Sequence, residues 1–298
     1  MLAAIVLGIV QGLTEFLPVS SSGHLVLVPY FLPDYIPAPG LAFDVALHAG
    51  TLMAVVLYFR GDIAYLTTRT FALRGDPVEV AGARRTVALL ALGSVPAAVV
   101  GLLFRETFEE AFRRPELVGG FLLVTAALLT GAEWIRRRRL VAATGISFEE
   151  ARDRPDAEIG RDETTVGVRD AAAIGVAQAL SIFPGISRSG ATIATGMGLG
   201  LSRGAAARFS FLLSIPIVFG ATLVEFTRFT GEGGAGGAYG GGEVIAGVLT
   251  AAIAGYWAIS FLIKLVARED LIGFARYVAL LGALTYVGYL WLGPPSTI

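Results

Sequence analysis

Polar side chains that could bind and cleave a phosphate group are concentrated in two short stretches of this chain. Residues 8–25 read GIVQGLTEFLPVSSSGHL and contain Gln11, Glu15, Ser20, Ser21, Ser22 and His24. Residues 175–192 read GVAQALSIFPGISRSGAT and contain Ser187, Arg188, Ser189 and Thr192. Together they supply a carboxylate, an imidazole, a guanidinium and many hydroxyl groups. Because such donors hold phosphate oxygens and phosphoryl chemistry needs a proton acceptor, this composition is typical of a phosphate site.

The two stretches are copies of one pattern at a constant offset of 167 residues. Each copy is an apolar half-helix, a proline break and a hydroxyl-rich turn that could open a second helix. Identical residues match in the pairs Gly8/Gly175, Gln11/Gln178, Leu13/Leu180, Phe16/Phe183, Ser20/Ser187, Ser22/Ser189 and Gly23/Gly190. The copies differ where chemistry would be decided, because Glu15, Ser21 and His24 align with Ile182, Arg188 and Ala191. We therefore expect two unequal halves of one site.

The serines and Arg188 have a chemical interpretation and a structural one. Serines after a break are natural N-caps, and a helix N-terminus also offers free N–H groups to an anion. Arg188 can hold phosphate oxygens bidentately and, if buried, needs an anionic partner, either phosphate or Glu15. Thr192 lies four residues further on and is expected to face the same site.

Glu15 and His24 are the candidates for proton transfer. Glu15 lies four residues after Gln11, on the same helical face, and a carboxylate inside an apolar segment is costly enough to indicate function. It could act as a general base, a metal ligand or an orienter of His24, or form a simple ion pair. His24 could attack phosphorus or act as a base. His48, four residues after Asp44, is interpreted as a structural hydrogen bond or as support for the site.

The overall composition indicates an integral membrane protein. Hydrophobic residues make up 55% of the 298 and charged residues only 16%, with a mean hydropathy of +0.70. A soluble protein of this size needs more polar surface than that. The absence of cysteine excludes disulfides, thiolate metal sites and cysteine nucleophiles. Nucleic-acid binding is not expected, because the arginine runs lie beside hydrophobic segments without interleaved aromatic residues.

Six segments are long and apolar enough to cross a bilayer: residues 41–59, 85–104, 116–135, 206–227, 243–266 and 273–292. The repeated stretches are shorter and split by proline, so we expect re-entrant helical hairpins over residues 1–32 and 170–202; ordinary short helices are the alternative. The expected fold is all-α, a polytopic membrane protein of six full transmembrane helices plus two re-entrant hairpins. Because three spans follow each hairpin, the halves 1–140 and 170–298 would form an inverted repeat, joined by a cytoplasmic linker at 141–169.

Positive charge predicts the orientation of this arrangement. Most of the 23 Arg and Lys residues fall in the segments 60–85, 136–169 and 264–276, which lie on one side of the six-span arrangement. Such loops usually face the cytoplasm. We therefore expect a multi-pass protein of the plasma membrane, with both termini outside and a first hairpin that enters from the extracytoplasmic side.

At these residues the sequence resembles the undecaprenyl-diphosphate phosphatase family, the BacA/UppP type once described as bacitracin-resistance proteins. Two motifs carry the resemblance: an (E/Q)xxxE pattern that runs into FLPVSSSGH, here Gln11 to His24, and PGxSRSxxT, here Pro184 to Thr192. The segments 43–60 and 207–216 also look like the family, so the resemblance covers nearly the whole chain.

The resemblance implies a membrane hydrolase that removes the terminal phosphate of a C55-type polyprenyl diphosphate and returns the monophosphate carrier to cell-wall glycan synthesis. It implies that Glu15, Ser21, His24 and Arg188 are catalytic. It also implies that the phosphate is lined by Gln11, Ser20, Ser22, Ser187, Ser189 and Thr192. A divalent cation, Mg²⁺ or Ca²⁺, and a site that opens outward follow from the same resemblance. The expected partners are the polyprenyl diphosphate and the bilayer, with a homodimer left open.

One position departs from the family pattern. Well-known members often carry glutamate where this chain has Gln11, so metal ligation would rest on Glu15 and on substrate oxygens. A hard ion with few protein ligands, bridging diphosphate oxygens, is ordinary for Mg²⁺.

The nucleophile and the class of activity stay open at this point. Ser21, His24 and water are candidate nucleophiles, and we favour Ser21 with His24 as its base and Glu15 as orienter of the imidazole or the ion. A transporter or flippase of polyprenyl phosphate lipids is the main alternative, because inverted repeats with midplane sites are a transporter plan. A non-catalytic protein that binds lipid diphosphates is a third, and Glu15 and His24 argue against it.

Overall fold

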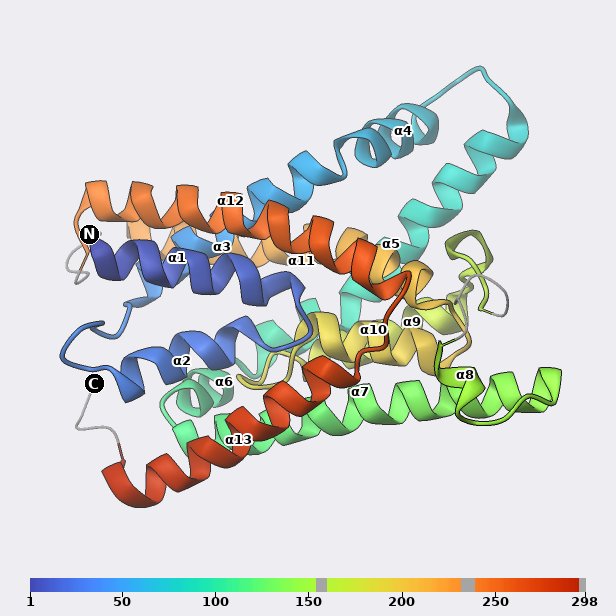
Figure 1. The fold of residues 1–298 in the computed structure, drawn as a ribbon. Coiled ribbons are helices and arrows are strands. Elements are labelled where there is room, and N and C mark those ends of the chain that lie inside the picture. The colour runs from blue at the N-terminus through green and yellow to red at the C-terminus, as the bar shows by residue number, and fades with distance from the viewer. Residues whose placement is uncertain (154–159, 232–238, 295–298) are drawn as a thin grey trace.

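Every regular element in the part of the chain that the structure describes is a helix (Figure 1). The structure is a computed structural model, and it describes residues 1–153, 160–231 and 239–294. Within these ranges the all-α prediction is confirmed.

Five helices are long and apolar enough to cross a membrane: α5 (Pro77–Leu103), α7 (Pro115–Thr144), α11 (Arg203–Gly231), α12 (Gly241–Val266) and α13 (Ile272–Leu292). A bent pair, α3 (Leu41–Tyr58) and α4 (Arg60–Thr70), meets the same criteria as one broken span with a 72° bend. All six predicted spans therefore coincide with helices. The described residues fit a multi-pass membrane protein with five or six spanning helices.

Two helices lie in segments that the sequence predicted to be loops. Residues 60–85 contain α4 and the first turns of α5, and α6 (Arg105–Phe112) follows α5. The sequence of α4, RGDIAYLTTRT, has no buried residues and therefore no apolar stripe that would reveal a helix. The start of α5 does carry a readable signal, because Asp76 accepts a hydrogen bond from the N–H of Val78 and Pro77 occupies the first helical position.

Four shorter helices form two hairpins. The first hairpin is α1 (Leu2–Phe16) and α2 (Ser21–Phe31), and the second hairpin is α9 (Val168–Leu180) and α10 (Arg188–Gly198). At a rise of about 1.5 Å per residue, none of the four reaches the roughly 30 Å needed to cross a hydrocarbon core. In Figure 1 the first hairpin begins and ends on the side where α13 ends, and its turn points into the molecule.

Each hairpin packs against the other half of the chain. α1 lies along α12, and α9 lies along α5, while α7 and α13 pack against each other (Figure 1). Gly8 and Gly175 make the two hairpin contacts possible: a Cβ at Gly8 would lie 2.4 Å from the carbonyl oxygen of Gly247, and one at Gly175 would lie 2.5 Å from that of Gly93. These backbone approaches exclude any side chain, so the matching glycines of the repeat fix matching interfaces.

A buried ion pair ties three of the long helices together away from the hairpin turns. Glu133 of α7 accepts two hydrogen bonds from Arg203 of α11, at 2.8 and 2.7 Å. The same carboxylate accepts the main-chain N–H of Leu271, just before α13, at 3.0 Å. Each of the two charged side chains is only 1% exposed. A pair satisfied in this way tolerates burial, and removing one partner would leave an uncompensated charge.

The segment between the two halves is docked on the second hairpin. Arg161 exchanges main-chain hydrogen bonds with Gly200 and Ser202, both at 2.9 Å, and its guanidinium pairs with Asp170 at 2.9 Å. Two short helices, α8 (Glu150–Asp153) and η2 (Glu163–Thr165), lie in the same stretch. The part of the predicted linker at 154–159 lies outside the described residues.

Candidate active site

The turn of the first hairpin is held in an unusual backbone conformation. Ser20 has φ 70°, and among the described residues it is the one non-glycine residue with a positive φ. Its hydroxyl caps α2 by accepting from the N–H of Gly23 at 3.2 Å. The same oxygen accepts the N–H of Gly185, in the turn of the second hairpin, at 3.1 Å. Sparsely populated conformations persist where the surroundings enforce them, and here the enforcing contact joins the two turns.

The turn of the second hairpin places Arg188 at the first position of α10. Ser187 caps this helix by accepting from the N–H of Gly190 at 3.0 Å. Gly185 has φ 104°, and a Cβ there would lie 2.5 Å from the carbonyl oxygen of Val118. Thr125 of α7 donates to the carbonyl of Gly185 at 2.9 Å and accepts from the N–H of Ser187 at 3.0 Å. α7 therefore fixes the turn that positions Arg188.

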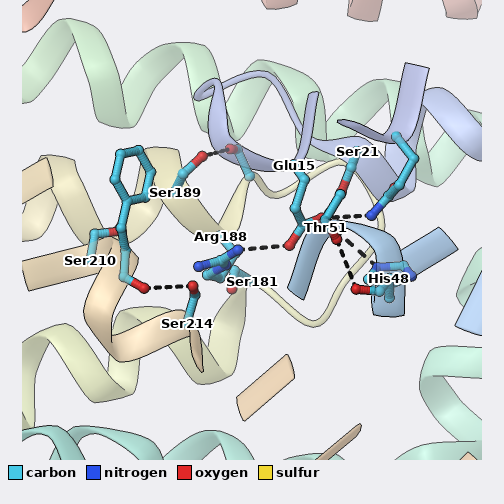
Figure 2. A network of polar contacts seen from close by, with 12 residues as sticks. Glu15, Ser21, His48, Thr51, Ser181, Arg188, Ser189, Ser210 and Ser214 are labelled. Atoms are coloured by element: carbon cyan, nitrogen blue, oxygen red, sulfur yellow. Dashed lines mark hydrogen bonds and ion pairs between the residues drawn. The ribbon is translucent and has the colours of Figure 1, made fainter. Parts of the chain in front are cut away.

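The two hairpins meet at the carboxylate of Glu15 (Figure 2). Arg188 Nη2 donates to Oε1 of Glu15 at 2.7 Å. Oε2 accepts from the hydroxyl of Ser21 at 2.5 Å and from the amide of Gln11 at 3.1 Å. Glu15 is 8% exposed and the Arg188 side chain 13%. The ion pair considered in the sequence analysis is thus present, and it brings a candidate base, a candidate nucleophile and a cation within one contact of each other.

Two buried polar atoms at this meeting point have no hydrogen-bond partner among the described residues. They are Nη1 of Arg188 and Oε1 of Gln11. An unsatisfied donor of a charged guanidinium is costly to bury, so its position indicates where an anionic ligand would bind. Charge-assisted bonds from a guanidinium to phosphate oxygens are commonly bidentate. Arg188 can therefore hold Glu15 with one nitrogen and a phosphate oxygen with the other.

Four of the other predicted site hydroxyls form two matching contacts, one in each turn. Ser20 and Ser22 lie 3.3 Å apart between their hydroxyl oxygens, and Ser187 and Ser189 lie 3.2 Å apart. Ser189 also donates to the carbonyl of Leu17 at 3.0 Å, which ties α10 to the first hairpin. These side chains build the turns around the site. Whether they also contact phosphate stays a prediction.

Thr192 lies one helical turn after Arg188, but its hydroxyl is bonded within the protein. Its oxygen lies 2.7 Å from the carbonyl oxygen of Arg188 and 2.6 Å from the hydroxyl of Ser210 in α11. Both Thr192 and Ser210 are buried. The contact joins α10 to α11 and supports the position of Arg188.

His24 contacts α13. Its Nδ1 lies 2.7 Å from the carbonyl oxygen of Ser20, and its Nε2 lies 2.7 Å from the hydroxyl of Tyr277. The rings are nearly parallel, with centroids 5.7 Å apart. Both ring nitrogens are thus engaged by groups other than Ser21, although the sequence favoured His24 as the base for that hydroxyl. Tyr277 was missed because a tyrosine in a spanning helix is ordinarily an interfacial residue.

His48 is the residue that sequence reasoning undervalued. Its Nδ1 lies 2.8 Å from the main-chain carbonyl of Asp44, so the predicted hydrogen bond within the helix exists, but to the backbone. Its Nε2 lies 3.8 Å from Oε2 of Glu15 (Figure 2). The available signal was an imidazole in a mostly apolar span, four residues after Asp44 and three before Thr51.

The protein donors suit a divalent cation only if the substrate supplies further oxygens. No group of three His, Cys, Asp or Glu side chains that could hold a metal occurs among the described residues. At the meeting point, Glu15 is one carboxylate already paired with Arg188, and Gln11 offers its unpartnered amide oxygen. Mg²⁺ typically takes one or two protein oxygens together with substrate phosphates and waters. These residues fit an ion that binds together with the substrate. They do not fit a site in which protein side chains supply all the ligands.

Comparison with known proteins places this chain in a family. Residues 4–284 match the family model described as Bacitracin resistance protein BacA. A relative from Geotalea daltonii named undecaprenyl-diphosphatase is 40% identical over 287 residues, which cover 95% of this chain and 96% of the relative. Relatives of the same name from Gemmatimonas aurantiaca and Rubrobacter xylanophilus are 41% and 42% identical, each with 95% of this chain and 96% of the relative covered. The chain belongs to the BacA family.

Proposed function

We propose that this chain is an integral membrane hydrolase that removes the terminal phosphate of undecaprenyl diphosphate, giving undecaprenyl phosphate and inorganic phosphate. Relatives named undecaprenyl-diphosphatase along almost the whole chain support this activity and substrate. The observation in the site that carries the proposal is the buried contact of Glu15 with Ser21 and Arg188, beside an unpartnered Arg188 nitrogen. The lipid product would be the carrier that is recycled for cell-envelope glycan synthesis.

Arg188 and the two helix N-termini would bind the terminal phosphate. α2 and α10 begin within the two touching turns, so their first N–H groups are near one another. Such groups and a guanidinium stabilise negative charge without reorganising, and this is the main contribution that proteins make to phosphoryl transfer. Glu15, which neutralises Arg188 in the free protein, would then share the guanidinium with the substrate.

Ser21 is the nucleophile that the contacts favour. Its hydroxyl donates to Glu15 at 2.5 Å, so the carboxylate can take the proton as the Oγ–phosphorus bond forms and the bond from phosphorus to undecaprenyl phosphate breaks. Water then breaks the Oγ–phosphorus bond and Ser21 recovers a proton. One water proton stays on inorganic phosphate and the other passes through Glu15 to Ser21, while the proton that Glu15 first took from Ser21 leaves to solvent. This mechanism moves the role of base from His24 to Glu15, which is the group in contact with the hydroxyl.

A divalent cation, Mg²⁺ or Ca²⁺, is proposed to bind together with the diphosphate. Glu15 and the amide oxygen of Gln11 would be its protein ligands, and substrate oxygens would supply the rest. When bound, the ion would neutralise charge on the diphosphate oxygens.

The proposed membrane arrangement follows the sequence prediction. Residues 1–140 and 170–298 would be inverted halves joined by the linker 141–169, with α1–α2 and α9–α10 as re-entrant hairpins. The reciprocal packing of α1 on α12 and α9 on α5 supports this arrangement. The distribution of Arg and Lys supports a site that opens to the extracytoplasmic side of the plasma membrane, with both termini outside.

Phosphate release in detergent micelles tests the proposal directly. Purified protein should release inorganic phosphate from undecaprenyl or farnesyl diphosphate with Mg²⁺ and without any membrane gradient. Ser21→Ala should lose this activity. Ser94→Ala, which removes a hydroxyl that among the described residues bonds the carbonyl of Leu90 in α5, should retain it. A transporter or flippase would release no phosphate under these conditions. A binding protein would retain the intact diphosphate, and either result would contradict the proposal.

A further inference from the structure

The tautomer of His48 is set by the main chain of its own helix. Nδ1 lies 2.8 Å from the carbonyl oxygen of Asp44, and a carbonyl oxygen can only accept. Nδ1 therefore carries the hydrogen. The other nitrogen of a neutral imidazole is then an acceptor, and its position is fixed by the bond that the first one makes. Since the acceptor at Asp44 is backbone, every side-chain substitution at that position preserves this tautomer.

In the neutral imidazole of His48, Nε2 is an acceptor that faces a second acceptor. Nε2 lies 3.8 Å from Oε2 of Glu15, which is beyond the 2.7–2.9 Å or so of a charge-assisted bond. That carboxylate oxygen already accepts from Ser21 and Gln11. Two acceptors at this spacing are not a direct pair, but a small molecule with two O–H groups can donate to both. Water is that molecule.

His48 is also the more accessible of the two groups. Its side chain is 33% exposed, whereas Glu15 is 8% exposed. Part of the imidazole surface of His48 is therefore not covered by protein. The imidazole of His24, in contrast, is buried and its Nε2 is occupied by the hydroxyl of Tyr277.

We propose that His48 is a positioning residue that holds, together with Oε2 of Glu15, the water that completes hydrolysis. The proposal rests on the function proposed above. The water oxygen forms a bond to phosphorus, the bond from phosphorus to Ser21 Oγ breaks, and the protons are distributed as already described. In this step Ser21 Oγ is bonded to phosphorus, and Oε2 of Glu15, which accepts from Ser21 in the free protein, has already passed on the proton that it took. Oε2 and Nε2 of His48 therefore each accept one hydrogen of the water, and its oxygen lone pairs are free to attack. His48 thereby sets the direction of attack without touching the substrate.

The tautomer can be measured without any activity. His24 and His48 are the only two histidines of the chain, so protein labelled with ¹⁵N-histidine gives two imidazole spin systems, and His24→Asn assigns them. His48 should show the tautomer with a protonated Nδ1 and an unprotonated Nε2. An imidazolium, or the opposite tautomer, would make Nε2 a donor to Glu15 and would overturn the proposal.

Steady-state kinetics then distinguishes a His48 that orients water from a His48 that only supports the fold. His48→Leu should lower kcat by about a hundredfold with KM nearly unchanged, because misplacing a reacting group by about 1 Å costs that much. His48→Gln keeps an acceptor and should recover most of the turnover, whereas His48→Lys, which supplies only donors, should not. Thr51→Val, which removes a hydroxyl bonded to the carbonyl of His48, is the matched control and should match wild type.

Competition between methanol and water gives a product ratio that would not change if His48 had only a structural role. Methanol has one O–H group and cannot donate to both acceptors, so wild type should form little methyl phosphate, and His48→Leu should form a larger share. If wild type releases phosphate, and His48→Leu shows the same kcat and the same ratio of methyl phosphate to inorganic phosphate, the role of His48 is overturned and the proposed function is not. Absence of phosphate release by wild type would instead overturn the proposed function.

Discussion

The two hairpins share a scaffold and differ in their chemistry. In both, a serine caps the second helix, a pair of serine hydroxyls lies 3.2–3.3 Å apart, and a glycine lets the first helix touch a backbone of the other half. Even the glutamines match, since Gln11 and Gln178 each bury an Oε1 without a partner among the described residues. The shared residues are therefore those that shape and dock the hairpins.

The residues that differ are those that meet at the site. Glu15 and Ser21 belong to the first hairpin, and Arg188 of the second occupies the position of Ser21 in the repeat. Only the combination yields a carboxylate that is in contact with both a hydroxyl and a guanidinium. A symmetric site would hold two copies of one group. The difference teaches that the repeat supplies the geometry, and that the departures from it supply the groups of the proposed chemistry.

The largest loss of turnover is expected when the second hairpin is given the residue of the first at position 188. Arg188→Ser places the same residue at both repeat positions and removes the proposed phosphate donor. Turnover should fall by about 10²–10³-fold, as for loss of one oxyanion donor. Arg188→Lys keeps the positive charge but loses the bidentate hydrogen-bond geometry of the guanidinium, and should recover only part of the activity. Phosphate release in micelles measures both, with gel filtration to establish the fold. Wild-type turnover in Arg188→Ser would refute the assignment.

An intermediate effect is expected at the matched glutamines. Gln11→Glu adds a carboxylate beside Glu15 and should lower the Mg²⁺ concentration for half-maximal activity by about tenfold, because ligand charge tunes affinity for hard cations. Gln178→Glu is the control, because its amide donates to the carbonyl of Gly93 in α5, away from Glu15. It should destabilise the protein without changing the Mg²⁺ titration. Equal titrations for Gln11→Glu and wild type would remove Gln11 from the ion site.

The smallest effect is expected at the caps. Ser187→Ala removes one capping bond and should lower the free energy of unfolding by about 1 kcal/mol. Ser20→Ala removes the equivalent cap and also the acceptor for Gly185, so its loss should be larger. Thermal unfolding in detergent compares the two. A smaller loss for Ser20→Ala than for Ser187→Ala would show that the contact between the turns contributes nothing to stability.

The sequence allowed the spans and the hairpin residues to be predicted because apolar length and polar residues within apolar stretches are local signals. The contact between Glu15 and Arg188 was also among the expected pairs, because a buried cation needs an anion. His48 and Tyr277 could not be placed, because the sequence does not specify which face of a spanning helix meets the hairpins. α4 was missed for a different reason, since no apolar stripe marks it.

The reciprocal packing of the hairpins has a consequence for biosynthesis. α1 leaves the ribosome first, yet the helix against which it packs most extensively, α12, begins only at Gly241. At a synthesis rate of about 5–20 residues per second, α1 waits roughly ten to fifty seconds for that partner. A chain that stops after its first half holds Glu15 and Ser21 without the cation or the helix that secures them. By the proposed mechanism, the nascent protein should therefore release no phosphate until its second half has been synthesised.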